Sequence, residues 1–134
     1  MNDKRNFYID GAWVAPREGS DFPVYNPATE EPYATISLGG AADAEAAIAA
    51  ARRTFPGWSM TTPAERGEVL RAVLSVYEAR TADMAEAIST EMGAPIDMAT
   101  SDQAGAGRSH LKAFLRALDA FEWQRPLRPG VNGQ

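Results

Sequence analysis

The sequence predicts an α+β fold that is mostly helical, with about four helices and a small antiparallel sheet at the amino terminus. Residues 6–38 hold short runs of aromatic and β-branched residues separated by turn residues, which is typical of strands. Residues 43–122 carry apolar residues at helical spacing, with cap signals at several helix ends. The strands come first and the helices afterwards, whereas a self-contained parallel α/β sheet would alternate them.

The strand region opens with a predicted hairpin. Segments 7–9 and 13–14 flank Asp10 and Gly11, and this pair suits a tight turn because glycine adopts positive φ without steric cost. The other elements expected here are a proline-containing edge strand at 22–25, a turn at 26–29 and a strand at 33–38.

The first helix is expected to begin at Asp43, which suits the N-cap, and to end at Pro56-Gly57. Its predicted inner face carries apolar residues at helical spacing, namely Ala44, Ala47, Ile48, Ala51 and Phe55.

The second helix has the strongest start signal in the chain, a capping box at 62–65 with proline at the first helical position. We expect its apolar stripe to be buried as ordinary core; the stripe consists of Val69, Leu70, Val73, Leu74 and Tyr77.

A third helix is expected from Thr81 to the segment 92–95, where Gly93 suits a left-handed cap and proline follows it. A fourth helix is expected over residues 96–121. Its second half has a clear apolar face, formed by Leu111, Phe114, Leu115, Leu118 and Phe121.

The fourth helix also contains Gly105 and Gly107, each of which weakens a helix by roughly 1 kcal/mol relative to alanine. We interpret them as points where another element approaches closely. They do not fit a dinucleotide fingerprint, because no strand precedes them and the third glycine is missing. Residues 125–134 are expected to form a linker or a truncated end, so that residues 1–124 make up one structural unit.

Composition excludes several classes of function. The formal net charge of -5 argues against a nucleic-acid partner, and no run approaches the roughly 18 apolar residues of a membrane span. The chain has no cysteine, which excludes disulfides and a catalytic thiolate. His110 is the one histidine and is expected to be a surface or packing residue, while Asp97 and Asp102 are expected to be helix caps or solvated charges. A cytoplasmic protein that contacts no membrane is the expectation.

Five segments are similar to one known family in both order and spacing. They are 8–14 (YIDGAWV), 22–30 (FPVYNPATE), 50–58 (AARRTFPGW), 63–66 (PAER) and 91–95 (EMGAP). They resemble the amino-terminal segment of the aldehyde dehydrogenase superfamily, and the resemblance runs from about residue 7 to residue 121. Two departures are Glu31, where the family usually has an apolar or β-branched residue, and Ala94, which replaces a common lysine.

The resemblance implies oxidation of an aldehyde to a carboxylic acid with NAD or NADP. In the family a cysteine thiolate attacks the aldehyde, a hydride passes to the nicotinamide, and a glutamate activates the hydrolytic water. These residues and the cofactor-binding sheet lie after the matched region in relatives, whose corresponding part packs outside a Rossmann-like sheet. We therefore expect no catalytic residue, no cofactor-binding residue and no activity in this chain alone.

The resemblance further implies a monovalent-cation site of the kind found in some family members. The backbone carbonyls near Val24 and Tyr25 and the carboxylate of Glu91 would contribute to it, because a hard cation prefers oxygen ligands. The alternative is that Glu91 is an ordinary charged residue near a helix end.

Three hypotheses about function follow. The first is a segment of an NAD(P)-dependent aldehyde dehydrogenase, whose partner is the remainder of that chain and which forms a homo-oligomer when complete. It predicts that apolar faces of this chain are left uncovered. The second is a non-catalytic helical module for interaction or assembly. The third, an enzyme with another nucleophile, ranks lowest because no Ser, Lys or Asp lies in a recognisable activating context.

Overall fold

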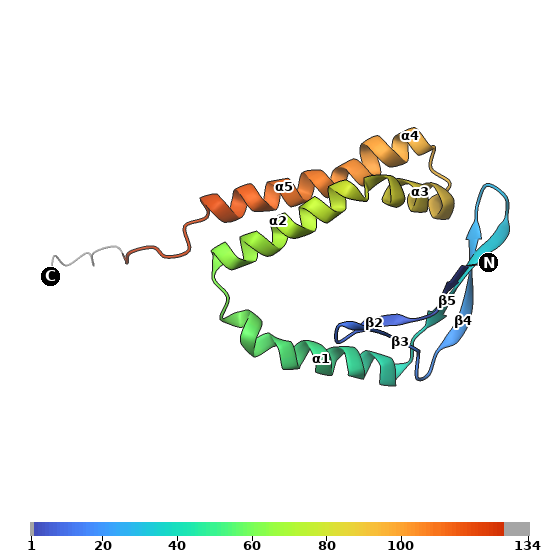
Figure 1. Ribbon diagram of the computed structural model, residues 1–134, viewed down its shortest axis with the longest axis horizontal. Helices are drawn as coiled ribbons and strands as arrows, with labels where there is room; N and C mark the ends of the chain where they lie inside the picture. Colours follow the sequence, from blue (N-terminus) through green and yellow to red (C-terminus); the bar gives the residue numbers. More distant parts are fainter. Residues whose placement is uncertain (1, 128–134) are drawn as a thin grey trace.

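The computed structural model describes residues 2–127 (Figure 1). The strands are β1 (Asn2–Lys4), β2 (Phe7–Ile9), β3 (Ala12–Val14), β4 (Ser20–Asn26) and β5 (Glu31–Leu38). The helices are α1 (Ala41–Ser59), α2 (Pro63–Ala79), α3 (Thr81–Met92), α4 (Ile96–Met98), the π-helical segment η1 (Ala99–Ala104) and α5 (Gly105–Ala120). The predicted α+β class, with helices after strands, is confirmed. The predicted linker 125–134 lies mostly outside the described residues.

The strands form two small sheets rather than one. β4 and β5 pair antiparallel, and the hairpin β2–β3 stands as a separate antiparallel pair, as expected from the turn signals. β1 was not predicted, and it adds a parallel strand to β5, so that the larger sheet has the order β1-β5-β4. The residues of β1 are polar and exposed, so the sequence has no apolar pattern that would predict this strand.

The predicted turns take the backbone conformations that their residues favour. Asp10 and Gly11 both have positive φ, 55° and 79°, as a two-residue hairpin turn of type I′ requires. Tyr8 and Trp13 face each other across this hairpin with their rings edge to face, 5.3 Å apart. The proline-containing strand β4 lies at a sheet edge, as predicted.

Helix α1 differs from the prediction at both ends. It begins after Gly40, two residues before Asp43, and it continues through Pro56 to Ser59. Pro56 lies in the last turn, where its missing N–H costs only one intrahelical hydrogen bond. The carboxylate of Asp43 accepts N–H groups from Gly40 at 3.1 Å, Arg17 at 2.8 Å and Glu18 at 3.3 Å. Asp43 therefore caps α1 from inside the helix and also fastens the preceding loop to it.

The predicted apolar face of α1 is not buried by this chain. The residues turned toward the hairpin are Asp43, Ala46 and Ala50, whereas Ile48 and Phe55 are exposed. Apolar spacing locates a face that can be buried, but it does not say which chain buries it.

Helix α2 begins at the predicted capping box. The Thr62 hydroxyl accepts the N–H of Glu65 at 3.2 Å, and the Glu65 carboxylate accepts the N–H of Thr62 at 2.7 Å. Arg66 secures the link from α1, because its Nε donates to Thr61 at 2.9 Å and its guanidinium lies 5.7 Å from the centre of the Trp58 ring.

The predicted core stripe of α2 is split between two sides of the helix. Leu70, Leu74 and Tyr77 are half-buried on the side that packs against α5, while Val69 and Val73 are each 47% exposed. The stripe of α5 is divided in the same way: its leucines are half-buried, and its aromatic residues Phe114 and Phe121 are exposed. The expectation of one buried core stripe per helix was wrong, because α2 and α5 cover only one side of each other.

The fourth predicted helix is a continuous helical stretch interrupted by the π-helical turn η1. The hydroxyl of Tyr77 in α2 donates to the carbonyl of Ala104, the last residue of η1, at 2.8 Å. A Cβ atom at Gly107 would collide with this same hydroxyl and ring, whereas a Cβ at Gly105 would meet nothing nearer than the Thr100 carbonyl at 3.7 Å. The predicted close approach is therefore real at Gly107.

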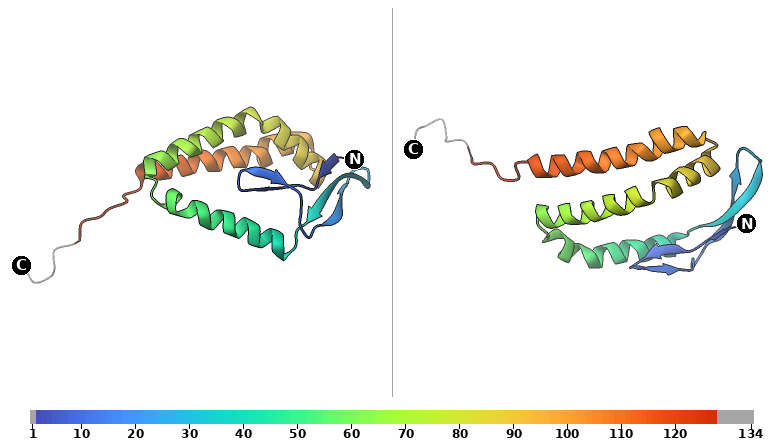
Figure 2. Two further views of the ribbon diagram at one scale, coloured as in Figure 1. Left: turned by 60° about the horizontal axis from the view of Figure 1, so that its bottom comes forward. Right: turned by 45° about the horizontal axis from the view of Figure 1, so that its top comes forward.

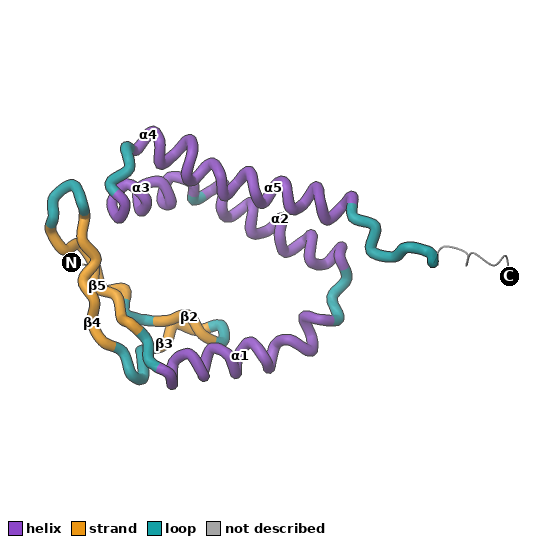
Figure 3. Tube along the Cα trace, turned by 180° about the vertical axis from the view of Figure 1, so that it is seen from behind, coloured by secondary structure: helices purple, strands orange, loops and turns teal. Residues whose placement is uncertain are grey.

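In Figures 1 and 3 and in the right view of Figure 2, α1 and the hairpin lie on one side of the molecule and α2, α3 and α5 on the other. The sheet joins the two sides at one end, and the link between α1 and α2 joins them at the other. Among the described helices, none combines the length and apolar character needed to cross a membrane.

The chain has almost no core of large side chains. Its five buried apolar residues in the described part are all alanines: Ala34, Ala50, Ala85, Ala99 and Ala104. Its accessible surface is 10316 Å², against the roughly 6,800 Å² expected for a compact protein of its mass. The chain therefore exposes apolar surface that a self-contained domain would bury.

The two glycines of α5 provide a matched test of the close helix contact. Gly107→Ala should lower the free energy of unfolding by about 1–3 kcal/mol, because the new methyl group displaces Tyr77. Gly105→Ala has room for its methyl group and should raise the same quantity by up to about 1 kcal/mol. Urea unfolding followed by helical circular dichroism measures both, and equal effects of the two variants would contradict the contact.

The cap at Asp43 should make stability depend on pH. Hydrogen bonds from the backbone N–H groups of Arg17, Gly40 and Glu18 lower the pKa of Asp43 in the folded chain. Its stabilising contribution is therefore present above the unfolded-state pKa and is lost as pH falls through the folded value. Asp43→Asn should reduce stability at neutral pH and flatten the acid side of the stability profile. Asp119→Asn, on the exposed side of α5, should change neither the stability at neutral pH nor its loss in acid. Thermal unfolding from pH 3 to 8 compares the two variants.

Candidate functional site

One corner of the structure brings together the residues that the sequence analysis selected as cation ligands. Glu91 lies in the last turn of α3, which packs against β4, the strand of Val24 and Tyr25. The hydroxyl of Tyr33, on the neighbouring strand β5, donates to Oε1 of Glu91 at 2.5 Å. Burial and the nearby Glu91 carboxylate raise the pKa of Tyr33 to about 12, so its hydroxyl stays protonated at neutral pH.

The strand pairing opposite Val24 and Tyr25 is irregular. Val24 pairs with Ala34 and Tyr25 with Pro32, so Tyr33 is the extra residue of a β-bulge in β5, and a bulge disrupts the hydrogen-bond ladder locally. The residue opposite Tyr25 is Pro32, which has no N–H to donate. Carbonyl oxygens at this position therefore have fewer ladder donors than those of a regular strand pair.

The end of α3 adds negative potential to this corner. The helix ends at Gly93, which has the left-handed φ of 73° predicted for a glycine cap, and a Cβ there would lie 2.9 Å from the Pro27 side chain. Carbonyl groups at a helix carboxyl end carry partial negative charge, and basic residues in the last turn commonly offset it. The last turn of α3 has no basic residue and contains the acidic Glu91.

The oxygen-rich, negative corner fits a small monovalent cation better than a transition metal. Residues 2–127 contain no group of three or more His, Cys, Asp or Glu that could hold a metal ion. Backbone carbonyls with a single carboxylate are ligands for a hard, weakly charged ion. Glu91 thus lies in an element that contacts the strand of Val24 and Tyr25.

Tyr33 is the residue of this corner that the sequence analysis missed. It was treated only as the start of a strand, and its partner Glu91 lies 58 positions away along the chain. No local motif signals a hydrogen bond over that distance, so only the packing of α3 against the sheet reveals it.

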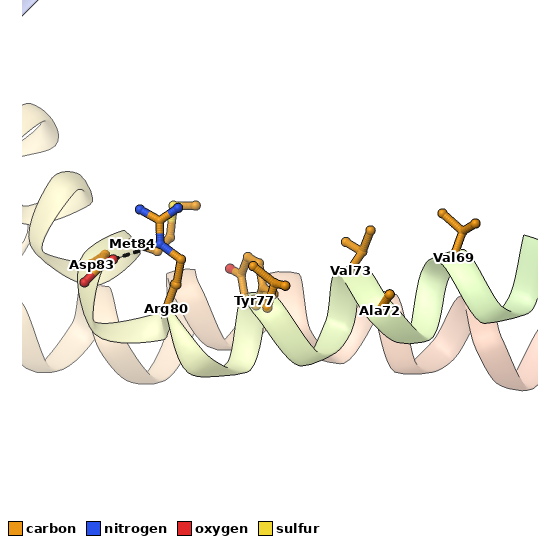
Figure 4. A pocket seen from close by; sticks show the side chains of 8 residues that line it. Val69, Ala72, Val73, Tyr77, Arg80, Asp83 and Met84 are labelled. Carbon is orange, nitrogen blue, oxygen red and sulfur yellow. Dashed lines mark hydrogen bonds and ion pairs between the residues drawn. The ribbon is translucent and has the colours of Figure 1, made fainter. Parts of the chain in front are cut away.

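A second feature is an apolar groove of about 600 Å³ along α2 and the start of α3. Figure 4 shows its side chains projecting from one side of α2, with the Arg80–Asp83 ion pair at one end, 2.9 Å between Nε and Oδ2. The apolar lining consists of Val69, Ala72, Val73, Val76, Tyr77 and Met84. Val69, Val73, Val76 and Met84 are largely exposed, so the groove is a surface ready to be covered rather than a closed pocket.

The other residues considered in the sequence analysis have structural roles. Gly105 and Gly107 lie in a helix that follows another helical segment and not a strand, and Gly107 packs against Tyr77 of α2, whereas a Cβ at Gly105 would meet only a backbone carbonyl of η1. His110 is exposed on α5, and Asp97 and Asp102 are exposed near the start of the last helical stretch. The three tryptophans are 45–71% exposed, so they are not core residues of this chain.

Comparison with known proteins identifies relatives of this arrangement. A sequence model of the aldehyde dehydrogenase family matches residues 13–131. The 3-succinoylsemialdehyde-pyridine dehydrogenase of a Pseudomonas species is 41% identical over 128 residues, which are 95% of this chain and 27% of that protein. The chain thus spans about a quarter of the length of the curated relatives that it matches.

Solved structures agree with the sequence match. The crystal structure of an aldehyde dehydrogenase from Bartonella henselae has a TM-score of 0.94 and 45% identity, covering 98% of this chain and 28% of that one. A mutant of aldehyde dehydrogenase C from Pseudomonas syringae, in complex with NAD+ and octanal, has a TM-score of 0.89 and 39% identity. The matched region covers 92% of this chain and 26% of the Pseudomonas syringae chain.

The groove along α2 should bind hydrophobic dyes when the chain is studied alone. Val69→Glu combined with Val73→Glu should lower the fluorescence of the dye 1-anilinonaphthalene-8-sulfonate and reduce self-association while helicity is kept. Both positions are half-exposed, so water can hydrate the new charges. Leu118→Glu is the contrasting control, because Leu118 faces Gly67 between α2 and α5 and its replacement should reduce helicity. Unchanged dye binding in the double variant would rule out the groove as the exposed apolar site.

Proposed function

The chain belongs to the aldehyde dehydrogenase family, and we propose that it is the amino-terminal part of an enzyme that oxidises an aldehyde to a carboxylic acid. NAD or NADP is the proposed hydride acceptor. The observation that carries this proposal is the family match over residues 13–131, supported by a structural relative in complex with NAD+ and octanal. We place the complete protein in the cytoplasm and expect it to form a homo-oligomer.

This chain by itself is proposed to be inactive. The reaction needs a thiolate to form the covalent adduct from which the hydride leaves, and none of the 134 residues is cysteine. The described residues have a proposed structural role. The catalytic residues would lie in the remaining three quarters of such an enzyme, as judged by the length of the relatives.

The remainder of the enzyme is the proposed partner of the apolar surface. The groove on α2, the outward face of α1 and the exposed aromatic residues of α5 all carry apolar side chains that this chain leaves uncovered. Burial contributes about 25 cal/mol for each Å² of apolar surface removed from water. A covering sheet and its helices would therefore supply much of the stability that this chain lacks.

The corner between α3 and β4 is proposed to hold a monovalent cation such as Na⁺ or K⁺. Glu91 and carbonyl oxygens near Val24 and Tyr25 would coordinate it, and its charge would offset the negative end of α3. Its chemistry is structural: it would join a helix end to a sheet edge, away from the oxidation step.

A second candidate function is a non-catalytic assembly module. The exposed groove on α2 favours it, because such a groove can bind a partner helix as well as a covering sheet. This candidate requires the short chain to be a cooperatively folded unit that exists as such in its source.

Two measurements distinguish these functions. An antibody raised to this chain should detect a protein about four times heavier than 14.4 kDa in its source, as the fraction of relatives that it spans suggests. The purified chain should give no aldehyde-dependent NADH formation, and the heavier protein should give it readily. A single band at 14.4 kDa would favour the assembly module, and turnover by the purified chain would contradict the proposed inactivity.

A further inference from the structure

We infer that Tyr33, the extra residue of the β-bulge in β5, is a positioning residue for the cation site, and that its hydroxyl holds the carboxylate of Glu91 near β4. This inference rests on the cation site proposed above and goes beyond it, because Tyr33 is not one of the ligands. It assigns a role to a contact that joins two elements 58 positions apart in the sequence.

The geometry leaves the carboxylate free to bind an ion. Tyr33 donates to Oε1 of Glu91 at 2.5 Å, which leaves Oε2 available. Within residues 2–127, no ion pair involves Glu91, while seven other ion pairs occur there. Glu91 is thus a carboxylate that is fixed in position but not neutralised.

The neutral hydroxyl of Tyr33 suits a residue that positions Glu91 for a cation better than one that only stabilises the fold. A lysine or arginine at the position of Tyr33 would hold Glu91 equally well but would cancel its charge. A neutral phenol fixes the carboxylate and leaves its full charge for a cation. A glutamate has three rotatable side-chain bonds, so fixing it beforehand lowers the entropy lost when an ion binds.

The electrostatic potential around Glu91 is negative, which favours the binding of a cation. The carboxylate lies in the last turn of α3, where the helix end is itself negative and where this chain has no basic residue. The adjoining turn is held close, since Gly93 has no Cβ where Pro27 packs against it. The helix end and the carboxylate therefore both add negative potential beside β4, whose carbonyl oxygen atoms would complete the proposed set of cation ligands.

The test compares cation affinity in the complete dehydrogenase carrying Tyr33→Phe, Glu91→Gln or the control Tyr8→Phe. The unfolding midpoint is measured against NaCl and KCl, with tetramethylammonium chloride keeping the ionic strength constant. Tyr33→Phe should raise the cation concentration that gives half of the stabilisation by about 10- to 100-fold, as is typical when a residue behind a metal ligand is lost. Glu91→Gln should abolish the specific response. Tyr8→Phe removes an exposed hydroxyl from the hairpin and should leave the response unchanged.

The outcomes separate this inference from the site on which it rests. If the unaltered protein responds to Na⁺ or K⁺ and Tyr33→Phe lowers stability equally in all salts, the Tyr33 hydrogen bond only stabilises the fold and the inference is overturned. If the unaltered protein shows no specific response, the cation site itself is wrong, and the inference fails with it. In the double variant, Tyr33→Phe should add nothing to the cation response of Glu91→Gln, because the hydroxyl acts through that carboxylate.

Discussion

The helical half of this chain is held together by close contact between small residues. Ala85, Ala99 and Ala104 form its buried cluster, and Gly107 lets the ring of Tyr77 lie against α5. Alanine buries little apolar area, so this cluster stabilises through tight van der Waals contact more than through the removal of large surfaces from water. The half-buried leucines of α2 and α5 fill the rest of the contact between these two helices, while the other large apolar residues of both helices point elsewhere.

The direction in which those larger residues point explains why the chain exposes so much surface. Val69 and Val73 lie on the side of α2 away from α5, and Phe114 and Phe121 are exposed on α5 itself. Helix α1 likewise presents Ile48 and Phe55 to the outside. An isolated domain of this size would turn such residues inward. Their placement supports the proposed burial against the remainder of a longer enzyme, because the family relatives are about four times as long as this chain.

Local signals in the sequence predicted most of the elements. The Asp10-Gly11 turn, the capping box at Thr62 and the left-handed Gly93 were all recognised, because each depends on residues within a few positions of one another. The parallel strand β1 and the extension of α1 through Pro56 were missed, since sheet pairing and neighbouring turns override weak local preference there.

The failures at the level of packing have one physical origin. Apolar periodicity finds the face that a helix can bury, but it cannot say whether the covering element belongs to the same chain. For this reason the stripe containing Val69 and Val73 was assigned to a core that this chain does not form. The proposed cation ligands rest on family resemblance, whereas no sequence signal indicates Tyr33, because its contact with Glu91 spans 58 positions.

The contact between Tyr33 and Glu91 also lies where the sheet, from which α1 departs, meets the layer of α2, α3 and α5. Helix α1 leaves the sheet directly after β5, the strand that carries Tyr33, and the helical layer meets the sheet through α3, the helix that carries Glu91. The far ends of α1 and α2 are joined by the short link at residues 60–62, so a rotation between α3 and β5 would change the separation of the two helices at the sheet end. Whatever covers the apolar faces needs both helices at a fixed separation, so rigidity at this corner controls the fit of the covering elements. The hydrogen bond between Tyr33 and Glu91 restricts that rotation, and the proposed ion would reinforce it.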